Sequence, residues 1–190
     1  MKNILIAISI FVLSFGCQDN TVSQILVSNA KELQDAISNA QPGDVLELKN
    51  GVWKDIQIEF IGQGTKGNPI TLRAETEGQV FIEGVSNLRF GGEYLVVNGL
   101  HFRNGHSPTK NVIAFRIDED RLANNCRVTN CVIIDFNKLQ RDHDDLWVQF
   151  YGRHNQLDHC YIAGKTNGGP TVRVDLKGNQ SIRNFHKIVN

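Results

Sequence analysis

Two basic residues near the C-terminal end, Lys165 and Arg173, are the best candidates for contacts with a polyanion. Lys165 ends the stretch "NQLDHCYIAGK", and Arg173 lies in the strand-like segment "TVRVDL" that follows it. If these segments are neighbours, both cations line one face and could bind the charged groups of an anionic polymer. The alternative is that Lys165 is a turn residue and Arg173 is a solvated strand residue.

The segment "RDHDDLW" holds a dense group of oxygen ligands, namely Asp142, Asp144 and Asp145, beside His143. Ligands at this density could hold calcium. Polar residues between two apolar runs are also typical of a solvated loop. We favour the loop.

Other side chains with chemical potential are His154, His159, Tyr151 and Arg153. The histidines could act as acid–base groups near neutral pH, and Tyr151 with Arg153 could stack on a sugar. We favour a structural role for His159 and a packing role for Tyr151. No nucleophile motif, phosphate-binding loop or zinc spacing stands out in the sequence.

The composition indicates one soluble domain with no global electrostatic preference. The chain has 190 residues, and its 20 basic residues balance 20 acidic ones. A balanced charge gives no general attraction to nucleic acid or to an anionic membrane. Any charged polymer must therefore be bound by local clusters, and no nucleic-acid partner is expected.

The first residues, "MKNILIAISIFVLSFGC", are typical of an export signal rather than of a membrane span. The small residues before Cys17 resemble a bacterial lipoprotein signal, in which this cysteine is lipidated. We expect a signal over residues 1–17, a polar tether over 18–26 and a folded domain over 27–190. The protein is then exported to the periplasm or the outer membrane of a bacterium, held to the membrane only by a lipid anchor. An ordinary cleaved signal is the alternative.

Three more cysteines follow the signal, namely Cys126, Cys131 and Cys160. The export route permits disulfides. An odd count leaves at least one thiol free, and the spacing does not indicate zinc.

Residues 28–40, "SNAKELQDAISNA", form the one segment with helical periodicity. Its apolar residues recur at offsets of three, four and seven, at Leu33, Ala36, Ile37 and Ala40. Ser28 or Asn29 can serve as N-cap, and "QPGD" ends the helix.

The rest of the chain repeats a strand pattern. Three similar segments align on Asn98, Asn130 and His159. Apolar residues lie two places before these positions, at Val96, Val128 and Leu157. Apolar residues also lie two places after them, at Leu100, Val132 and Tyr161, and four places after them, at Phe102, Ile134 and Ala163. A second strand series begins near Val112, Leu146 and Thr171. Recurrence at this period indicates a solenoid.

The short strands and irregular turns favour an all-β fold, a right-handed, single-stranded parallel β-helix of the pectin-lyase-like type with a short N-terminal capping helix. Equivalent residues should stack as ladders, with Asn98, Asn130 and His159 in one and Cys131 beside Cys160 in another. "HKIVN" aligns with the third segment, placing Ile188 at the Leu157 position. We therefore expect a C-terminally truncated β-helix that stops within its next coil.

Several stretches resemble polysaccharide lyase family 6, which groups alginate lyases with chondroitinase B. They are "LQDAISNAQPGDVLELKNGVW", "GNPITLRAE", "GQVFIEG", "YLVVNGLHFRNG" and "NQLDHCYIAGKTNGGPT". The resemblance covers residues 27–190, and the "NxxDHCYxxGKT" stretch is its most specific element.

The resemblance implies β-elimination at the uronic acids of an anionic polysaccharide, either alginate or a glycosaminoglycan. It implies calcium held by Asn and Glu, a Lys base and an Arg acid, on coils expected beyond Asn190. "NGGPTVRV" has Pro170 where a glutamate would be needed, so no catalytic or metal residue is assigned within the chain. We expect the chain alone to be inactive.

Two other functions stay open on the sequence alone. One is a non-catalytic, carbohydrate-binding β-helix. The other is a pectin hydrolase with paired carboxylates, which is disfavoured because "RDHDD" is the only dense acidic cluster and is interpreted as a loop.

Overall fold

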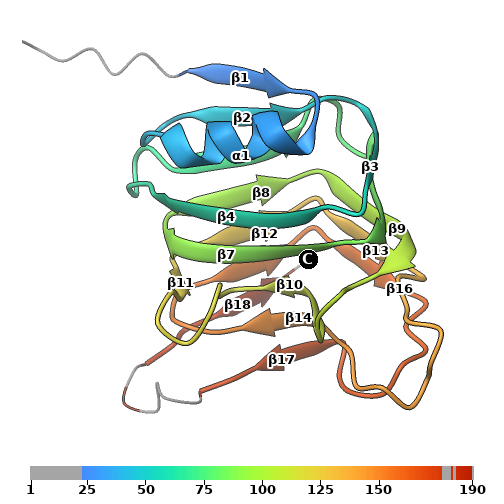
Figure 1. Ribbon diagram of the computed structural model, residues 1–190. Coiled ribbons are helices and arrows are strands. Elements are labelled where there is room, and N and C mark those ends of the chain that lie inside the picture. Colours follow the sequence, from blue (N-terminus) through green and yellow to red (C-terminus); the bar gives the residue numbers. More distant parts are fainter. Residues whose placement is uncertain (1–22, 177–180, 182, 190) are drawn as a thin grey trace, which may run out of the picture.

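The computed structural model describes residues 23–176, 181 and 183–189, and shows a parallel β-solenoid built from three sheets (Figure 1). Within these residues, five successive coils each add a strand to sheet A, then to sheet B and then to sheet C, whereas the first strand of sheet A is followed by a helix. Every pairing between the named strands is parallel, so the predicted parallel β-helix is confirmed.

The strands divide among the sheets as follows. Sheet A contains β1 (Gln24–Val27), β2 (Val45–Leu48), β5 (Ile70–Ala74), β8 (Leu95–Asn98), β12 (Arg127–Thr129), β15 (Gln156–Asp158) and β18 (Lys187–Val189). Sheet B contains β3 (Gly51–Lys54), β6 (Val80–Val85), β9 (Leu100–His106), β13 (Val132–Ile134) and β16 (Tyr161–Ala163). Sheet C contains β4 (Gln57–Gln63), β7 (Asn87–Glu93), β10 (Asn111–Ala114), β14 (Leu146–Phe150) and β17 (Val172–Val174), with β11 (Ala123–Asn124) paired to β7.

The helix α1 (Ala30–Asn39) covers the N-terminal end of the solenoid, as the sequence predicts (Figure 1). Asn29 is its N-cap, and its Oδ1 accepts a hydrogen bond from the Glu32 backbone N–H at 3.0 Å. The helix buries three of its own residues, Leu33, Ala36 and Ile37. Asn29, rather than Ser28, satisfies the free N–H groups of the first turn.

The N-terminal boundary of the solenoid differs slightly from the expected one. β1 begins at Gln24, so three residues assigned to the tether belong to sheet A instead. They pair in parallel with β2, which satisfies their backbone groups. Cys17 lies outside the described residues, and its lipidation stays a prediction.

The strand register corrects part of the repeat alignment. Val128 pairs with Leu157, as expected, but the preceding coil is shifted by one residue. Val97, not Val96, pairs with Val128, and Thr129 pairs with Asn98. Burial explains the shift: Val97 is completely buried in the core, whereas Val96 points outward. A one-residue slip would turn the strand's apolar face to solvent.

The turn between sheets A and B explains why the asparagine ladder survives that shift. Gly99, Asn130 and His159 have φ of 80°, 52° and 48°, in the left-handed region that Gly and Asn tolerate best. The Asn130 Nδ2 still donates to the Asn98 Oδ1 at 3.1 Å. The ladder contact between Asn98 and Asn130 is therefore confirmed, although their backbones are not in register.

A column of aromatic rings fills the core beneath sheet C. Phe60, Phe90, Phe115 and Phe150 follow one another on successive coils, with centroid separations of 6.0, 5.0 and 4.5 Å. His186 continues the column, 4.9 Å from Phe150. Rings at these distances contribute beyond the area they bury. The column therefore packs successive coils against one another beneath sheet C.

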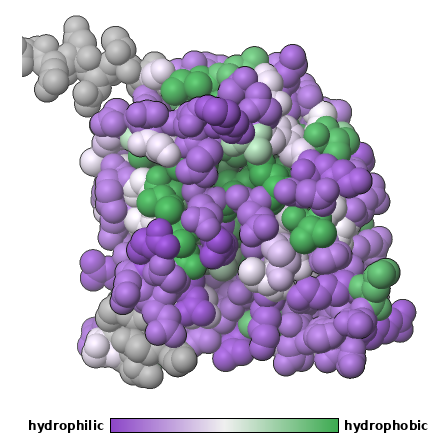
Figure 2. Space-filling model, in the orientation of Figure 1, coloured by the Kyte–Doolittle hydropathy of each residue, from purple (hydrophilic) through white to green (hydrophobic). Residues whose placement is uncertain are grey.

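The surface is mostly polar. Figure 2 shows a largely hydrophilic face with hydrophobic side chains in small separate areas. Among the described residues, no helix is both long and apolar enough to cross a bilayer. At the C-terminal edge, Ile188 pairs with Leu157 as predicted, and its side chain is about half exposed.

Candidate functional site

The turns that lead from sheet B to sheet C stack on one another and form the surface that we call the B–C turn face. It consists of residues 107–110, 135–145 and 164–171, each from a successive coil. A lysine recurs once in each turn, at Lys110, Lys138 and Lys165.

Lys138 joins the first two turns. Its Nζ donates to the Thr109 carbonyl at 2.7 Å and to the Asp145 Oδ1 at 2.9 Å. Asp145 is 2% exposed, so the lysine neutralises a buried carboxylate. A buried charge without a partner is strongly destabilising, so Lys138 stabilises the fold by pairing with Asp145.

Lys165 joins the backbone within the third turn. Its Nζ donates to the carbonyls of Asn167 and Gly168, at 2.5 and 2.7 Å, and its side chain is partly buried. The Asn167 Nδ2 in turn donates to the carbonyls of Lys138 and Gln140, which fastens this turn to the preceding one. The ammonium group of Lys165 is therefore occupied by protein groups.

Arg173 has a different environment. It lies on β17, its side chain is 51% exposed, and it is 3.3 Å from the Asp175 carboxylate. The third turn separates it along the chain from Lys165, and neither residue lines the cleft described below. Arg173 can reach a ligand in solvent.

We expect Lys165→Ala to lower the free energy of unfolding by about 1–3 kcal/mol, because two partly buried carbonyls lose their donor. Arg173→Ala should change it by less than about 0.5 kcal/mol, since exposed ion pairs contribute little. Urea unfolding followed by the fluorescence of buried Trp53 and Trp147 measures both. Equal stability of the two variants would contradict the structural role of Lys165.

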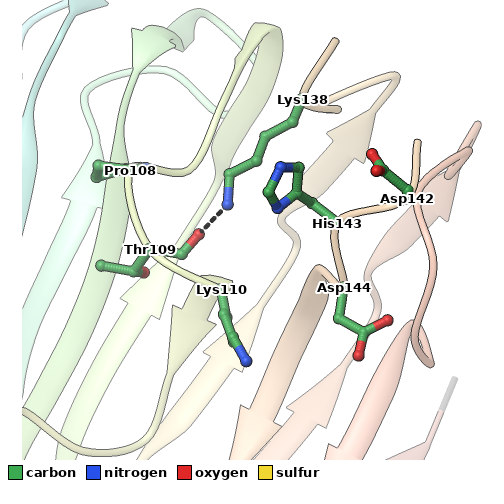
Figure 3. Close-up of a pocket in the computed structure, with 7 residues that line it drawn as sticks. All are labelled: Pro108, Thr109, Lys110, Lys138, Asp142, His143 and Asp144. Atoms are coloured by element: carbon green, nitrogen blue, oxygen red, sulfur yellow. Dashed lines mark hydrogen bonds between the residues drawn. The ribbon is translucent and has the colours of Figure 1, made fainter. Parts of the chain in front are cut away.

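A cleft of about 390 Å³ opens on the first two turns. Its lining residues are Pro108, Thr109, Lys110, Lys138, Asp142, His143 and Asp144. Figure 3 shows the His143 ring beside the Lys138 side chain, with the Lys138 ammonium reaching Thr109. This volume lies near the lower end of the range that is typical of small-ligand sites.

The charges of the cleft decide what it can bind. Lys110 and Lys138 carry two positive charges, Asp142 and Asp144 carry two negative charges, and Asp145 lies behind Lys138. The cleft therefore has no excess of positive charge with which to attract a polyanion. The side chains of Lys110 and His143 form no hydrogen bond or ion pair with other described residues, which leaves donors and acceptors for sugar hydroxyl groups.

The acidic side chains of the "RDHDD" turn do not gather into a metal-binding group. No group of three or more His, Cys, Asp or Glu side chains among the described residues is placed to hold a metal ion. Asp142, His143 and Asp144 are exposed on the loop, as expected, while Asp145 is buried and paired with Lys138. The "RDHDD" segment is a turn whose last acid is structural.

Of the other candidates, Tyr151 is buried, whereas Arg153 and His154 are exposed. Tyr151 is 3% exposed and the Arg116 guanidinium lies 3.9 Å from its ring centroid. Burial raises the pKa of Tyr151, which fits a closed environment. His154 stacks on Phe185, and Arg153 is exposed.

Sequence reasoning missed Lys110 and Lys138, the residues that shape the cleft. The one available signal was the recurrence of a lysine in each B–C turn, at a period close to that of the strands. The partnership of Lys138 with Asp145 could not be inferred, because nothing in the sequence distinguishes Asp145 from its exposed neighbours.

The structure places the chain in the class of parallel β-helix proteins, with a polar cleft on its stacked turns. The family described as chondroitinase B matches residues 27–190. The chain belongs to this family, polysaccharide lyase family 6.

Three solved structures illustrate the relationship. The alginate lyase AlyGC is 44% identical, with a TM-score of 0.85, over 87% of this chain and 23% of its own. The lyase Pedsa3628 from Pseudopedobacter saltans is 36% identical, with a TM-score of 0.78, over 86% and 36%. A mannuronic acid specific family 6 lyase from human gut microbiota is 33% identical, with a TM-score of 0.80, over 88% and 39%.

The chain thus spans less than two fifths of the length of these three relatives. A search of curated proteins found no match.

Proposed function

We propose that this chain is part of a polysaccharide lyase that cleaves an anionic polysaccharide by β-elimination at uronic acid residues. The observation that carries the proposal is the family match over residues 27–190, supported by 44% identity to an alginate lyase. Alginate is the first substrate to test, because the three solved relatives include an alginate lyase and a mannuronic acid specific enzyme.

The reaction requires three groups near the uronate. A base removes the proton at C5, an acid protonates the departing O4, and a positive charge stabilises the carboxylate next to the developing carbanion. A base must have a free lone pair within reach of the proton. The ammonium groups of Lys138 and Lys165 are both held by protein oxygens, so neither is available as that base.

We therefore assign the described coils a supporting role. They hold the B–C turn face rigid, and its cleft contributes hydrogen bonds to hydroxyl groups of the polymer. Arg173 adds an exposed cation on the neighbouring strand. Calcium remains an expectation from the resemblance, and no step is assigned to it here.

The test uses the polypeptide as it is encoded, including any residues that follow Asn190 in the same reading frame. Polymannuronate, polyguluronate and dermatan sulfate are incubated with it, and the ultraviolet absorbance of the unsaturated uronate product is followed. Formation of product from at least one of the three polymers is expected.

Binding without product would favour the alternative, a non-catalytic carbohydrate-binding β-helix. Affinity electrophoresis in gels containing each polymer, with neutral dextran as the control, measures binding independently of cleavage. Neither product nor retardation with any of the three polymers would contradict the proposal.

A further inference from the structure

Cys131 and Cys160 occupy equivalent positions on neighbouring coils. On one side of them Thr129 pairs with Asp158, and on the other side Val132 pairs with Tyr161. The turn between sheets A and B therefore keeps the two coils in register, with Cys131 opposite Cys160. Neighbouring strands are about 4.8 Å apart, which lies within the range of Cα separations, about 4.4–6.8 Å, that disulfides span.

The two thiols contact each other inside the solenoid. Cys131 is completely buried in the core, and Cys160 packs against the same core while remaining partly exposed. Their sulfur atoms are hydrogen-bonded to each other. Both cysteines are reduced in the structure.

We propose that Cys131 and Cys160 form an oxidisable pair that closes to a disulfide linking two coils of the solenoid. The inference rests on register and burial, and it is independent of the proposed lyase activity. An inter-coil bond at this point would fasten the coil that carries the "RDHDD" turn to the coil that carries Lys165.

Thiol–disulfide exchange begins at Cys160, the more exposed of the two cysteines. The hydrogen bond from Cys131 lowers the pKa of Cys160, whereas the same bond and burial raise the pKa of Cys131. The Cys160 thiolate attacks one sulfur of a low-molecular-weight disulfide, and that disulfide's other half leaves as a thiolate. Cys131 then loses its proton and attacks the Cys160 sulfur, releasing the second half as a thiol. The protein gives up two electrons and two protons, and one small disulfide becomes two thiols.

Cys126 provides an internal control. It is 1% exposed, and burial raises its pKa to about 12. Its sulfur contacts the backbone N–H of Leu95 and the carbonyl of Asn124 rather than another thiol. With no thiol beside it and no exposed route to an external oxidant, Cys126 should stay reduced.

The experiment treats the purified 190-residue chain with oxidised glutathione, blocks the remaining thiols and digests it with trypsin without reduction. Cleavage after Lys and Arg places the three cysteines in separate peptides, namely 122–127, 128–138 and 154–165. We expect most of peptides 128–138 and 154–165 to appear as one cross-linked species, lighter than their sum by two hydrogens. Peptide 122–127 should carry the blocking group.

Two variants make the result decisive. Cys160→Ser changes a partly exposed position and should abolish the cross-link while the protein stays folded, and Cys126→Ala should leave it intact. Oxidation should also raise the melting temperature of the wild type and not that of Cys160→Ser. Stable glutathione on Cys160 without a cross-link, or equal oxidation of Cys126, would overturn the proposal.

Discussion

Alanine in place of Arg127 is expected to lower the free energy of unfolding by about 3 kcal/mol near neutral pH, because it leaves a buried carboxylate without its main partner. The side chain of Asp158 is completely buried, and the Arg127 guanidinium binds it through two hydrogen bonds, of 2.8 and 3.0 Å. Gln156 and His159 also contact the carboxylate and remain in the variant. Because these two contacts remain, the loss in the free energy of unfolding should lie at the lower end of the range for broken buried ion pairs.

The same loss should depend on pH. Burial raises the pKa of Asp158, but hydrogen bonds from Arg127 and other neighbours outweigh it, and the folded-state pKa lies well below the usual range. A depressed pKa stabilises the fold above the unfolded value of about 4, and the contribution disappears as pH falls through the folded value. In the Arg127→Ala variant the folded-state pKa rises, so the difference from the wild type should shrink as pH falls below about 4.

Arg121→Ala is the matched control for this prediction. Arg121 pairs with Asp118, whose pKa it helps lower to about 2, but both side chains are about half exposed. Solvent screens such an exposed pair, so its contribution to stability is small. Urea unfolding at several pH values, followed by tryptophan fluorescence, should separate the two variants. A loss for Arg127→Ala no larger than that for Arg121→Ala would contradict the role of the buried pair.

Most of the fold could be predicted from the sequence, because a solenoid repeats its signals. Apolar residues alternating along each coil predict strands, and the helical periodicity of residues 28–40 predicts the cap, which the structure shows at Ala30–Asn39. The register of β8 was misplaced by one residue. The sequence shows an asparagine at 98 and another at 130, but the left-handed position is taken by Gly99, which an alignment on asparagines overlooks.

The candidate site was less predictable, because it depends on which cations already have partners. Lys165 and Arg173 look alike as isolated basic residues, yet the structure gives Lys165 two carbonyl acceptors and leaves Arg173 half exposed. The pairing of Lys138 with Asp145 joins two residues of one turn, the second of them directly before β14. Neither pattern nor spacing encodes such contacts, which follow from how the turns stack.

The second large effect is expected in the chemistry. We predict that the 190-residue chain by itself forms no unsaturated product. The ammonium groups of Lys138 and Lys165 on the B–C turn face are already bound to protein oxygens and cannot act as the base. Loss of the base lowers the reaction rate by about 10²–10⁴-fold, and loss of the acid lowers it by a similar factor. Weak retention on the polymers can persist, because millimolar binding requires only about 4 kcal/mol.

The direct measurement is the ultraviolet absorbance of the purified 190-residue chain with polymannuronate, polyguluronate and dermatan sulfate in the presence of calcium. Lys165→Ala and Arg173→Ala are assayed beside it, after their unfolding curves show that they are folded at the assay temperature. The account predicts no change in absorbance for any of the three proteins with any polymer. Steady product formation by the unaltered chain, lost in folded Lys165→Ala or Arg173→Ala, would show that these coils contain an active site of their own.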